Sequence, residues 1–219
     1  MNMRHLFIFL IVLSTITGFA QSNEWYEFKL DTVVSFSMPS NEIMLHDTIA
    51  LGFKIKTMSL SVENHIFIAQ KMNKIKKVEK ELSTLPHDSA SLNEFYLKLI
   101  DGMQESIPYN VIDKKAFSEN GLTGYFVSFG NELDKPVFHS KIYQLGKETY
   151  TLSYVNYEDF NDNLRDIYHN SIQINNIERI SQYEGTERGK RIAYILGKFI
   201  GGGMILFLLI FAAIKIFNK

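Results

Sequence analysis

The fold is decided by residues 111–155, which read VIDKKAFSENGLTGYFVSFGNELDKPVFHSKIYQLGKETYTLSYV. Apolar and polar residues alternate through much of this segment, which is the pattern of half-buried β-strands. Asn120-Gly121 interrupts the first half, and this pair accepts the positive φ angles of a type I′ hairpin turn. Gly146-Lys147 provides a second tight turn. The segment therefore predicts an antiparallel meander of four strands, at 111–118, 122–130, 135–145 and 148–155.

Two amphipathic helices flank this meander. Residues 91–107 carry apolar side chains at three- and four-residue steps, Ser91 and Glu94 fit a capping box, and Pro108 ends the helix. A second helix is predicted over 158–170. Other stretches have the pattern of short strands: 24–30, 33–38, 49–60, 62–70 and, after the second helix, 171–174. Because strands and helices come in separate runs, we expect an α+β fold. Its twisted antiparallel β-sheet has about six or seven strands, covered by two amphipathic helices.

The N-terminus has the pattern of a secretory signal peptide. Arg4 precedes a short apolar run at 6–13, and Gly18 and Ala20 supply the small residues of a cleavage site. We therefore expect residues 1–20 to be removed on export. The alternative is an uncleaved helix, but the run is shorter than the roughly 20 residues that a membrane span needs. The junction Phe19-Ala20-Gln21 resembles signal peptides of Bacteroidetes bacteria.

The segment 192–214 is apolar on all sides, which predicts one C-terminal transmembrane helix. It would be about 34 Å long, enough for a hydrocarbon core of about 30 Å. Lys198 lies inside this span, and its ammonium group can extend back to the interface, as that of Lys215 can at the other end. The alternative is a buried core helix, which would need a polar stripe that this segment lacks.

The two ends divide the chain into five parts: a signal peptide (1–20), an extracytoplasmic α+β domain (21–175), a polar juxtamembrane linker (176–191), the transmembrane helix (192–214) and a cytoplasmic tail (215–219). Basic residues flank the helix on both sides and do not orient it. A cleaved signal peptide would place the domain in the periplasm. Gly197 and Gly201 form a Gly-x-x-x-Gly motif, which lets two helices approach closely. Helix–helix association through this face is therefore one role open to the span.

At fold level, residues 25–175 resemble the Mog1/PsbP-like family of α/β sandwiches. The resemblance is carried by a strand ending in Phe36-Ser-Met-Pro39, the mid-chain amphipathic helix, the hairpin Asn120-Gly-Leu-Thr-Gly124, and Tyr150-Thr-Leu-Ser-Tyr154. Phe160 opens the final helix, and Ser171-Ile-Gln-Ile174 closes it. Because exported members are typically small accessory or binding domains, the resemblance implies a domain that is not an enzyme. The C-terminal span departs from the soluble or lipid-anchored members, so their partners do not transfer to this chain.

Composition and motifs predict no catalytic, cofactor or metal site. The chain has no cysteine, which excludes disulfides, thiolate metal sites, a cysteine nucleophile and a lipoprotein anchor. No two histidines have the spacing of a metalloprotease helix, and strand or surface positions explain them better: His5, His46, His65, His87, His139 and His169. Glu158, Asp159 and Asp162 could act in acid–base chemistry, but carboxylates at a helix start also stabilise the helix dipole.

Neither the charge nor the aromatic content of the chain identifies a partner. Between the two end segments lie 19 basic and 24 acidic residues, which argues against nucleic acid as the main partner. The basic run 71–80 could meet acidic lipid headgroups, although a solvated connection explains it better. Five tyrosines could form a binding groove, although strand propensity explains most of them: Tyr125, Tyr143, Tyr150, Tyr154 and Tyr157.

We therefore expect a single-pass membrane protein whose external domain binds a protein or another envelope component, without catalysis or cofactor. The alternative is a cell-envelope hydrolase without a recognisable motif. A deep polar pocket with converging acids or histidines would favour the hydrolase, and a shallow aromatic groove would favour binding. A third reading is an assembly subunit that acts through the glycine face of its span. The identity of the ligand or partner does not follow from the sequence.

Overall fold

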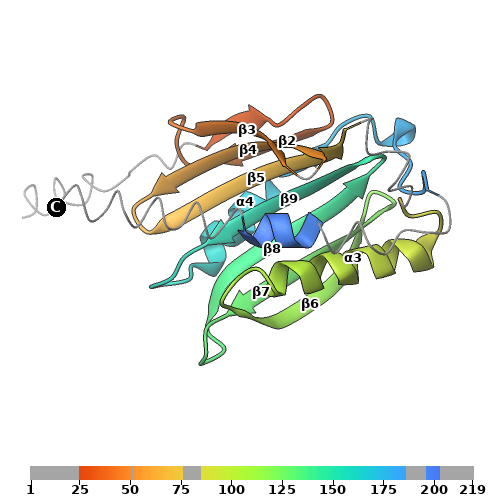
Figure 1. Cartoon of the computed structure of the whole chain (residues 1–219). Coiled ribbons are helices and arrows are strands. Elements are labelled where there is room, and N and C mark those ends of the chain that lie inside the picture. The colour runs from red at the N-terminus through yellow and green to blue at the C-terminus, as the bar shows by residue number, and fades with distance from the viewer. Residues whose placement is uncertain (1–24, 51, 76–84, 186–195, 203–219) are drawn as a thin grey trace, which may run out of the picture.

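The computed structural model describes residues 25–50, 52–75, 85–185 and 196–202. Seven strands form one antiparallel sheet in the order β3-β4-β5-β9-β8-β7-β6 (Figure 1). Their bounds are β3 (Met44–Ala50), β4 (Phe53–Val62), β5 (His65–Lys74), β6 (Asn110–Glu119), β7 (Leu122–Gly130), β8 (Pro136–Leu145) and β9 (Glu148–Val155). The α+β class and the seven-stranded antiparallel sheet are confirmed, and the predicted meander is β6 to β9.

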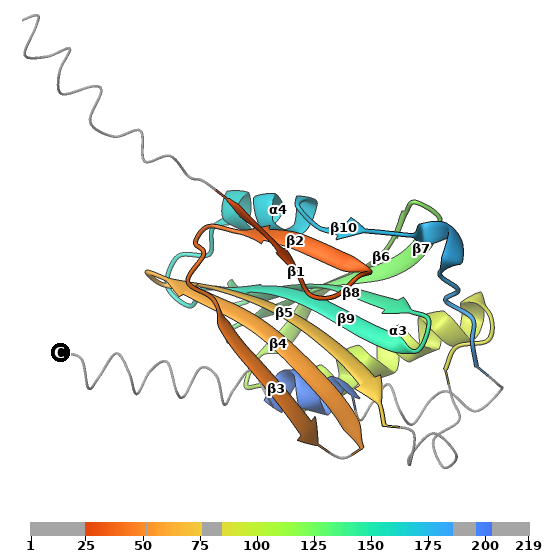
Figure 2. The same ribbon diagram turned by 90° about the horizontal axis from the view of Figure 1, so that it is seen from above.

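The first two strands do not join this sheet, which corrects the single sheet that we expected. β1 (Tyr26–Lys29), β2 (Val34–Met38) and β10 (Gln173–Ile174) form a separate sheet of three strands. Val34 and Phe36 of β2 are buried in a core cluster with Phe67 and Leu152 of the large sheet. The small sheet therefore lies as a second layer over one face of the large sheet, beside α4 (Asp162–Asn170) (Figure 2). We call this face the α4 face.

The opposite face, the α3 face, is covered by α3 (Ser89–Gln104) and by a helical segment at 196–202 (Figure 1). The apolar stripe of α3 is buried against β7 and β8, as its periodicity predicted. The N-cap is Asp88, whose carboxylate accepts a hydrogen bond from the Ser91 amide at 2.7 Å. The capping box is therefore Asp88 with Ser91, not Ser91 with Glu94.

Turn residues account for the hairpins, including one that the sequence did not reveal. Asn120 and Gly121 have φ angles of 53° and 79°, as the predicted type I′ turn requires. Gly52, with φ of 85°, lies in the turn between β3 and β4. Residues 49–60 were predicted as one strand, and the structure divides them between β3 and β4. The α4 helix begins at Asp162 instead of 158, because the Asn161 side chain caps it by accepting from the Leu164 amide.

The expected export and membrane segments fall mainly outside the described residues. The signal peptide (1–20) and the tail (215–219) lie outside them, and only 196–202 of the expected span 192–214 lies within them. Among the described residues, no helix is both long and apolar enough to cross a membrane. Lys71 and Lys74 of the basic run belong to β5, which corrects the connection expected there.

Candidate functional site

Lys71 lies on the α4 face and forms ion pairs with two carboxylates. Its Nζ is 2.6 Å from Asp31 Oδ2 and 2.7 Å from Glu148 Oε1. The Tyr150 hydroxyl donates to both carboxylates, at 2.6 and 2.7 Å. Burial acts to raise the pKa of Asp31, but the hydrogen bonds from Lys71 and Tyr150 outweigh it and hold the pKa below its ordinary value. Burial and the two acids raise the pKa of Tyr150, so it stays a neutral donor.

Lys141 forms a second such group, deeper in the same face. Only 5% of its side chain is exposed, and its Nζ is 2.9 Å from Glu119 Oε2. The same carboxylate oxygen accepts the Tyr143 hydroxyl at 2.8 Å. The ammonium also lies 5.0 to 5.5 Å from the ring centroids of Phe117, Phe126 and Tyr143, a distance at which cation–π attraction contributes. Although burial opposes it, bonding to Lys141 and Tyr143 lowers the pKa of Glu119. The Lys141 group thus balances one ammonium with one carboxylate, whereas the Lys71 group carries one ammonium and two carboxylates.

Two histidines pack together under α4. The rings of His139 and His169 are 5.0 Å apart, between the rings of Phe126 and Tyr168. His169 Nε2 is 3.0 Å from the Leu152 carbonyl, so this nitrogen carries the proton and donates. His139 Nδ1 is buried and has no hydrogen-bond partner among the described residues. Burial, with the nearby positive charge of Arg165, lowers the pKa of His139 to about 4. Both rings are therefore neutral core side chains at pH 7.

The remaining histidines and the acids do not converge on a site. His46 lies in β3 and contacts the Thr48 hydroxyl, His65 lies in β5 beside the Tyr154 hydroxyl, and His87 precedes α3. His5 lies outside the described residues. Asn156 accepts from the amides of Glu158 and Asp159, so these acids sit in a turn before α4. In the part of the chain that the structure describes, no group of three acids or histidines could hold a metal ion.

The five tyrosines do not form a groove. Tyr143, Tyr150 and Tyr154 are fully buried on the α4 face, and Tyr125 is buried on the α3 face against Tyr96. Only Tyr157 is exposed, where its ring contacts Tyr109. Tyr143 and Tyr150 are cross-strand partners on one face, and Tyr125 lies on the other face. Apart from Tyr157 they are core residues, as strand propensity predicted.

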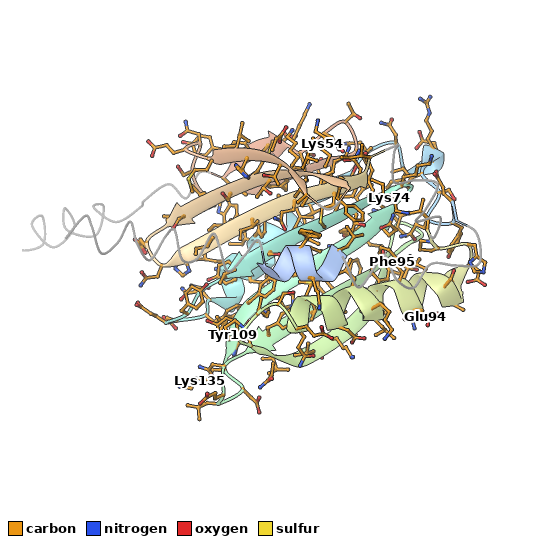
Figure 3. All side chains as sticks on the ribbon, viewed as in Figure 1. Lys54, Lys74, Glu94, Phe95, Tyr109 and Lys135 are labelled. Carbon is orange, nitrogen blue, oxygen red and sulfur yellow. The ribbon has the colours of Figure 1, made fainter. Side chains whose placement is uncertain are left out.

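One open hollow of about 570 Å³ lies between the end of α3 and β6, beside Tyr109 (Figure 3). Its charged residues are paired: Lys98 with Asp101 at 3.2 Å, and Glu105 with Lys198 at 3.1 Å. The lining residues are Lys98, Asp101, Gln104, Glu105, Ile107, Pro108, Tyr109 and Asn110, with no histidine, serine or threonine. A hydrolase needs an activated nucleophile or a positioned base, and the two acids of this hollow, Asp101 and Glu105, are each paired with a lysine.

The two edges of the large sheet differ in how they are protected. At one edge, β6 carries Asp113, Lys114 and Lys115, and its register with β7 shifts between Val111 and Asp113. Charged side chains and bulges are the usual means of blocking an edge strand. At the other edge, β3 pairs regularly with β4. Two of its apolar side chains, Leu45 and Ile49, are 64% and 70% exposed. Of the two, β3 is the edge open to a further strand.

β3 was not predicted as a strand of its own. Its residues read MLHDTIA and are exposed or half-buried throughout, so no burial pattern separates one face from the other. The signal that could have found it is Gly52 between two runs containing β-branched residues, which is typical of a hairpin.

Comparisons with known proteins return distant similarities. No family model and no curated protein matches the chain. The solution structure of cyanobacterial PsbP (CyanoP) from Synechocystis sp. PCC 6803 is similar with a TM-score of 0.43 and 16% identity, over 72% of this chain and 96% of that one. A crystal structure from Bacteroides thetaiotaomicron VPI-5482 is similar with a TM-score of 0.29 and 10% identity, over 66% of this chain and 46% of that one.

The first of these structures is a PsbP protein. The chain spans less than half the length of the second. At this level of similarity, neither structure says anything about the activity or partners of this chain.

Proposed function

We propose that this chain is a membrane-anchored domain outside the cytoplasm that binds an extended segment of an envelope protein along β3. The observation that carries the proposal is the β3 edge at one end of a seven-stranded sheet, which pairs regularly with β4 and carries exposed Leu45 and Ile49 beside a single acid, Asp47. An edge strand presents unpaired backbone amides and carbonyls, to which an extended segment can add as another strand.

Binding fits the rest of the molecule better than catalysis does. The charged side chains around Lys71 and Lys141 are paired with one another, and the hollow beside Tyr109 also holds paired charges. The His139–His169 pair is buried under α4 as neutral rings. The predicted signal peptide (1–20) and the apolar segment 192–214 support an anchored location, which would keep the β3 edge near other envelope proteins.

The experiment replaces the exposed apolar residues of β3 with lysine. Affinity purification of the full chain from detergent-solubilised native membranes should recover a partner protein. The variant Leu45→Lys/Ile49→Lys should reduce that recovery by about ten-fold or more, because lysine on an edge strand opposes the addition of another strand. Thermal unfolding should be nearly unchanged, since exposed substitutions cost roughly 0.5 kcal/mol or less.

The matched control is Leu133→Lys. Leu133 lies in the β7–β8 loop and is 76% exposed, so the change in chemistry is the same at a site away from the edge. It should leave partner recovery at the wild-type level. Equal loss in both variants, or no loss in either, would remove β3 as the binding surface. A mature chain that does not begin at Gln21, or that alkaline carbonate extracts from membranes, would reject the anchored location.

A further inference from the structure

Residues 196–202 occupy a groove on the α3 face, beside α3 (Figure 1). Leu196 and Ile200 are 4% and 1% exposed and belong to the core cluster that also contains Phe53 and Leu99. The Phe199 ring lies 6.4 Å from the Phe53 ring. Lys198 points outward and forms its ion pair with Glu105 of the α3 C-cap. We call this surface of α3 and β4 the α3 groove.

The glycine motif faces this groove. A Cβ atom added at Gly197 would lie 1.9 Å from the Leu99 carbonyl oxygen, a backbone atom that cannot easily move away. A Cβ atom at Gly201 would lie 2.6 Å from Ser106 Cβ and 2.7 Å from the Met103 carbonyl oxygen. By contrast, a Cβ atom at Gly202 would meet nothing within 4 Å. The close helix contact that a Gly-x-x-x-Gly motif permits is therefore made with α3 of the same chain.

The described chain after β10 is bonded to the body of the domain as far as Gly185. Residues expected to be a plain polar linker are bonded to the end of the sheet: Gly146 donates to the Ser181 carbonyl at 2.8 Å. The Gln182 side chain bonds to Thr123 and to the Gln144 carbonyl, and it is buried. The Gly185 amide then donates to the Pro86 carbonyl, just before α3. This path carries the chain from the small sheet towards the α3 face.

We propose that the α3 groove is the docking site of residues 196–202, and that docking and membrane insertion of these residues exclude each other. This inference rests on the proposed anchoring of the chain through 192–214. With 196–202 docked, the apolar residues 203–214 would give only about 18 Å of helix, well short of a hydrocarbon core of about 30 Å. Insertion therefore has to withdraw 196–202 from the groove. The chain thus has a docked form, with its anchor withheld, and an inserted form, with the groove open.

The two forms also differ in the environment of Lys198. In the docked form its ammonium group pairs with Glu105 in water. In the inserted form it would lie about 9 Å inside the start of the span and would have to extend back to the interface. The glycine face behaves in the opposite way. Larger residues at Gly197 or Gly201 clash in the groove, but they are tolerated in a lipid-facing helix.

The test locks the docked form by cross-linking. The wild-type chain has no cysteine, so Glu105→Cys/Lys198→Cys would carry the only two thiols. Both side chains are about half exposed, so a short, reductively cleavable thiol cross-linker can reach them. We expect the cross-linked mature chain to stay outside phosphatidylethanolamine/phosphatidylglycerol vesicles and to remain extractable with carbonate. Cleavage of the cross-link should restore insertion to the level of the unlinked chain.

The outcomes separate this inference from the proposed function. If the unlinked chain does not enter vesicles, the membrane anchor itself is rejected. If it does enter, but the linked chain enters equally well or no cross-link forms, the exclusive docking is overturned while the anchor stands. Gly197→Leu in the same two-cysteine background should lower cross-link yield in aqueous buffer by about ten-fold or more. The matched variant Gly202→Leu, with the same change in hydropathy, should leave the yield unchanged; equal yields in both would contradict the glycine contact.

Discussion

The two faces of the large sheet are covered in different ways. On the α4 face, the cover consists of α4 and the small sheet. Asp31, between β1 and β2, pairs with Lys71 of the large sheet, and beneath the cover the buried Lys141 pairs with Glu119 of the same large sheet. On the α3 face, the buried polar groups are neutral. They are hydroxyls and amides, such as Ser140 with Ser153 at 2.9 Å. The ion pair between Glu105 and the 196–202 segment, by contrast, lies half exposed at the surface.

This difference indicates which cover can detach. Removing a layer that pairs buried charges leaves a charge without its partner, which is costly in a poorly solvated site. Removing 196–202 breaks apolar contacts and a half-exposed ion pair, and exposed pairs contribute little. We therefore expect the α4 face to stay closed in every state of the folded domain, whereas the α3 face can lose part of its cover. Substitutions on the two faces can test this.

The largest effect is expected for Glu119→Gln on the α4 face. Lys141 would keep its charge but lose the carboxylate that neutralises it, and only 5% of its side chain is exposed. Breaking a fully buried pair in this way costs about 3 to 5 kcal/mol, and because the Glu119 side chain is 43% exposed we expect the lower end of this range. The surrounding rings of Phe117, Phe126 and Tyr143 recover part of this through cation–π attraction, so we expect a loss of about 3 kcal/mol in the free energy of unfolding. Urea denaturation measures it.

The double variant Glu119→Gln/Lys141→Met is the control for this prediction. It removes both charges and fills the space with an apolar side chain, so it should be more stable than Glu119→Gln alone. If Glu119→Gln alone unfolds at the wild-type urea concentration, the pairing of Lys141 does not stabilise the α4 face.

The next effect is an acid sensitivity of the α4 face that His139→Phe should reduce. Burial, with Arg165 nearby, lowers the pKa of His139 to about 4 in the folded chain, against 6.5 as its ordinary value. As pH falls below about 6.5, His139 becomes protonated in the unfolded chain but stays neutral in the folded chain. The free energy of unfolding therefore decreases steadily from about pH 6.5 to about pH 4. The shift corresponds to about 3 kcal/mol over that window.

Phenylalanine cannot titrate, and it fits beside Phe126 and His169, whose rings contact the His139 ring. We expect the variant to match the wild type at pH 7 and to lose clearly less stability at pH 4.5, as measured by urea denaturation at both pH values. Burial also lowers the pKa of His169, so part of the acid loss remains. His46→Phe, on the exposed strand β3, should follow the wild-type pH dependence. An unchanged acid loss in His139→Phe would exclude His139 as its source.

Local patterns predicted about half of this architecture. The bounds of β7 and β9 were predicted to the residue, because alternation and the Asn120-Gly121 turn are encoded in adjacent residues. The separate layer of β1 and β2 was not predicted. Alternation shows that a strand has an inner face, but it does not show which sheet the strand joins. β3 was missed because its residues are exposed or half-buried throughout, so burial imposes no pattern on them.

The charged groups were beyond sequence reasoning for a related reason. Lys71 was read as part of a solvated basic run, yet its partner Asp31 lies 40 residues away. Glu119 and Lys141 have no spacing that marks a pair, and only the packing of β6, β7 and β8 brings them together. The Gly197–Gly201 motif permits a close helix contact, but the sequence could not show that α3 would be a partner. These ion pairs and this helix contact depend on residues that are distant in the sequence and meet only in the folded chain.

The smallest effect is expected for Ile200→Ala, on the cover that we propose to be detachable. Ile200 and Ile142 are both almost completely buried on the α3 face. If 196–202 can undock while the rest of the domain stays folded, the stability that Ile200→Ala removes cannot exceed the free energy of docking. We expect this loss in the free energy of unfolding to be about 1 kcal/mol. Ile142→Ala, in β8 beneath α3, should cost about 3 kcal/mol, because the whole core must accommodate the cavity. Urea denaturation measures both losses, and amide hydrogen exchange should show faster exchange confined to 196–202 in Ile200→Ala. Equal losses in the two variants would mean that 196–202 unfolds together with the domain.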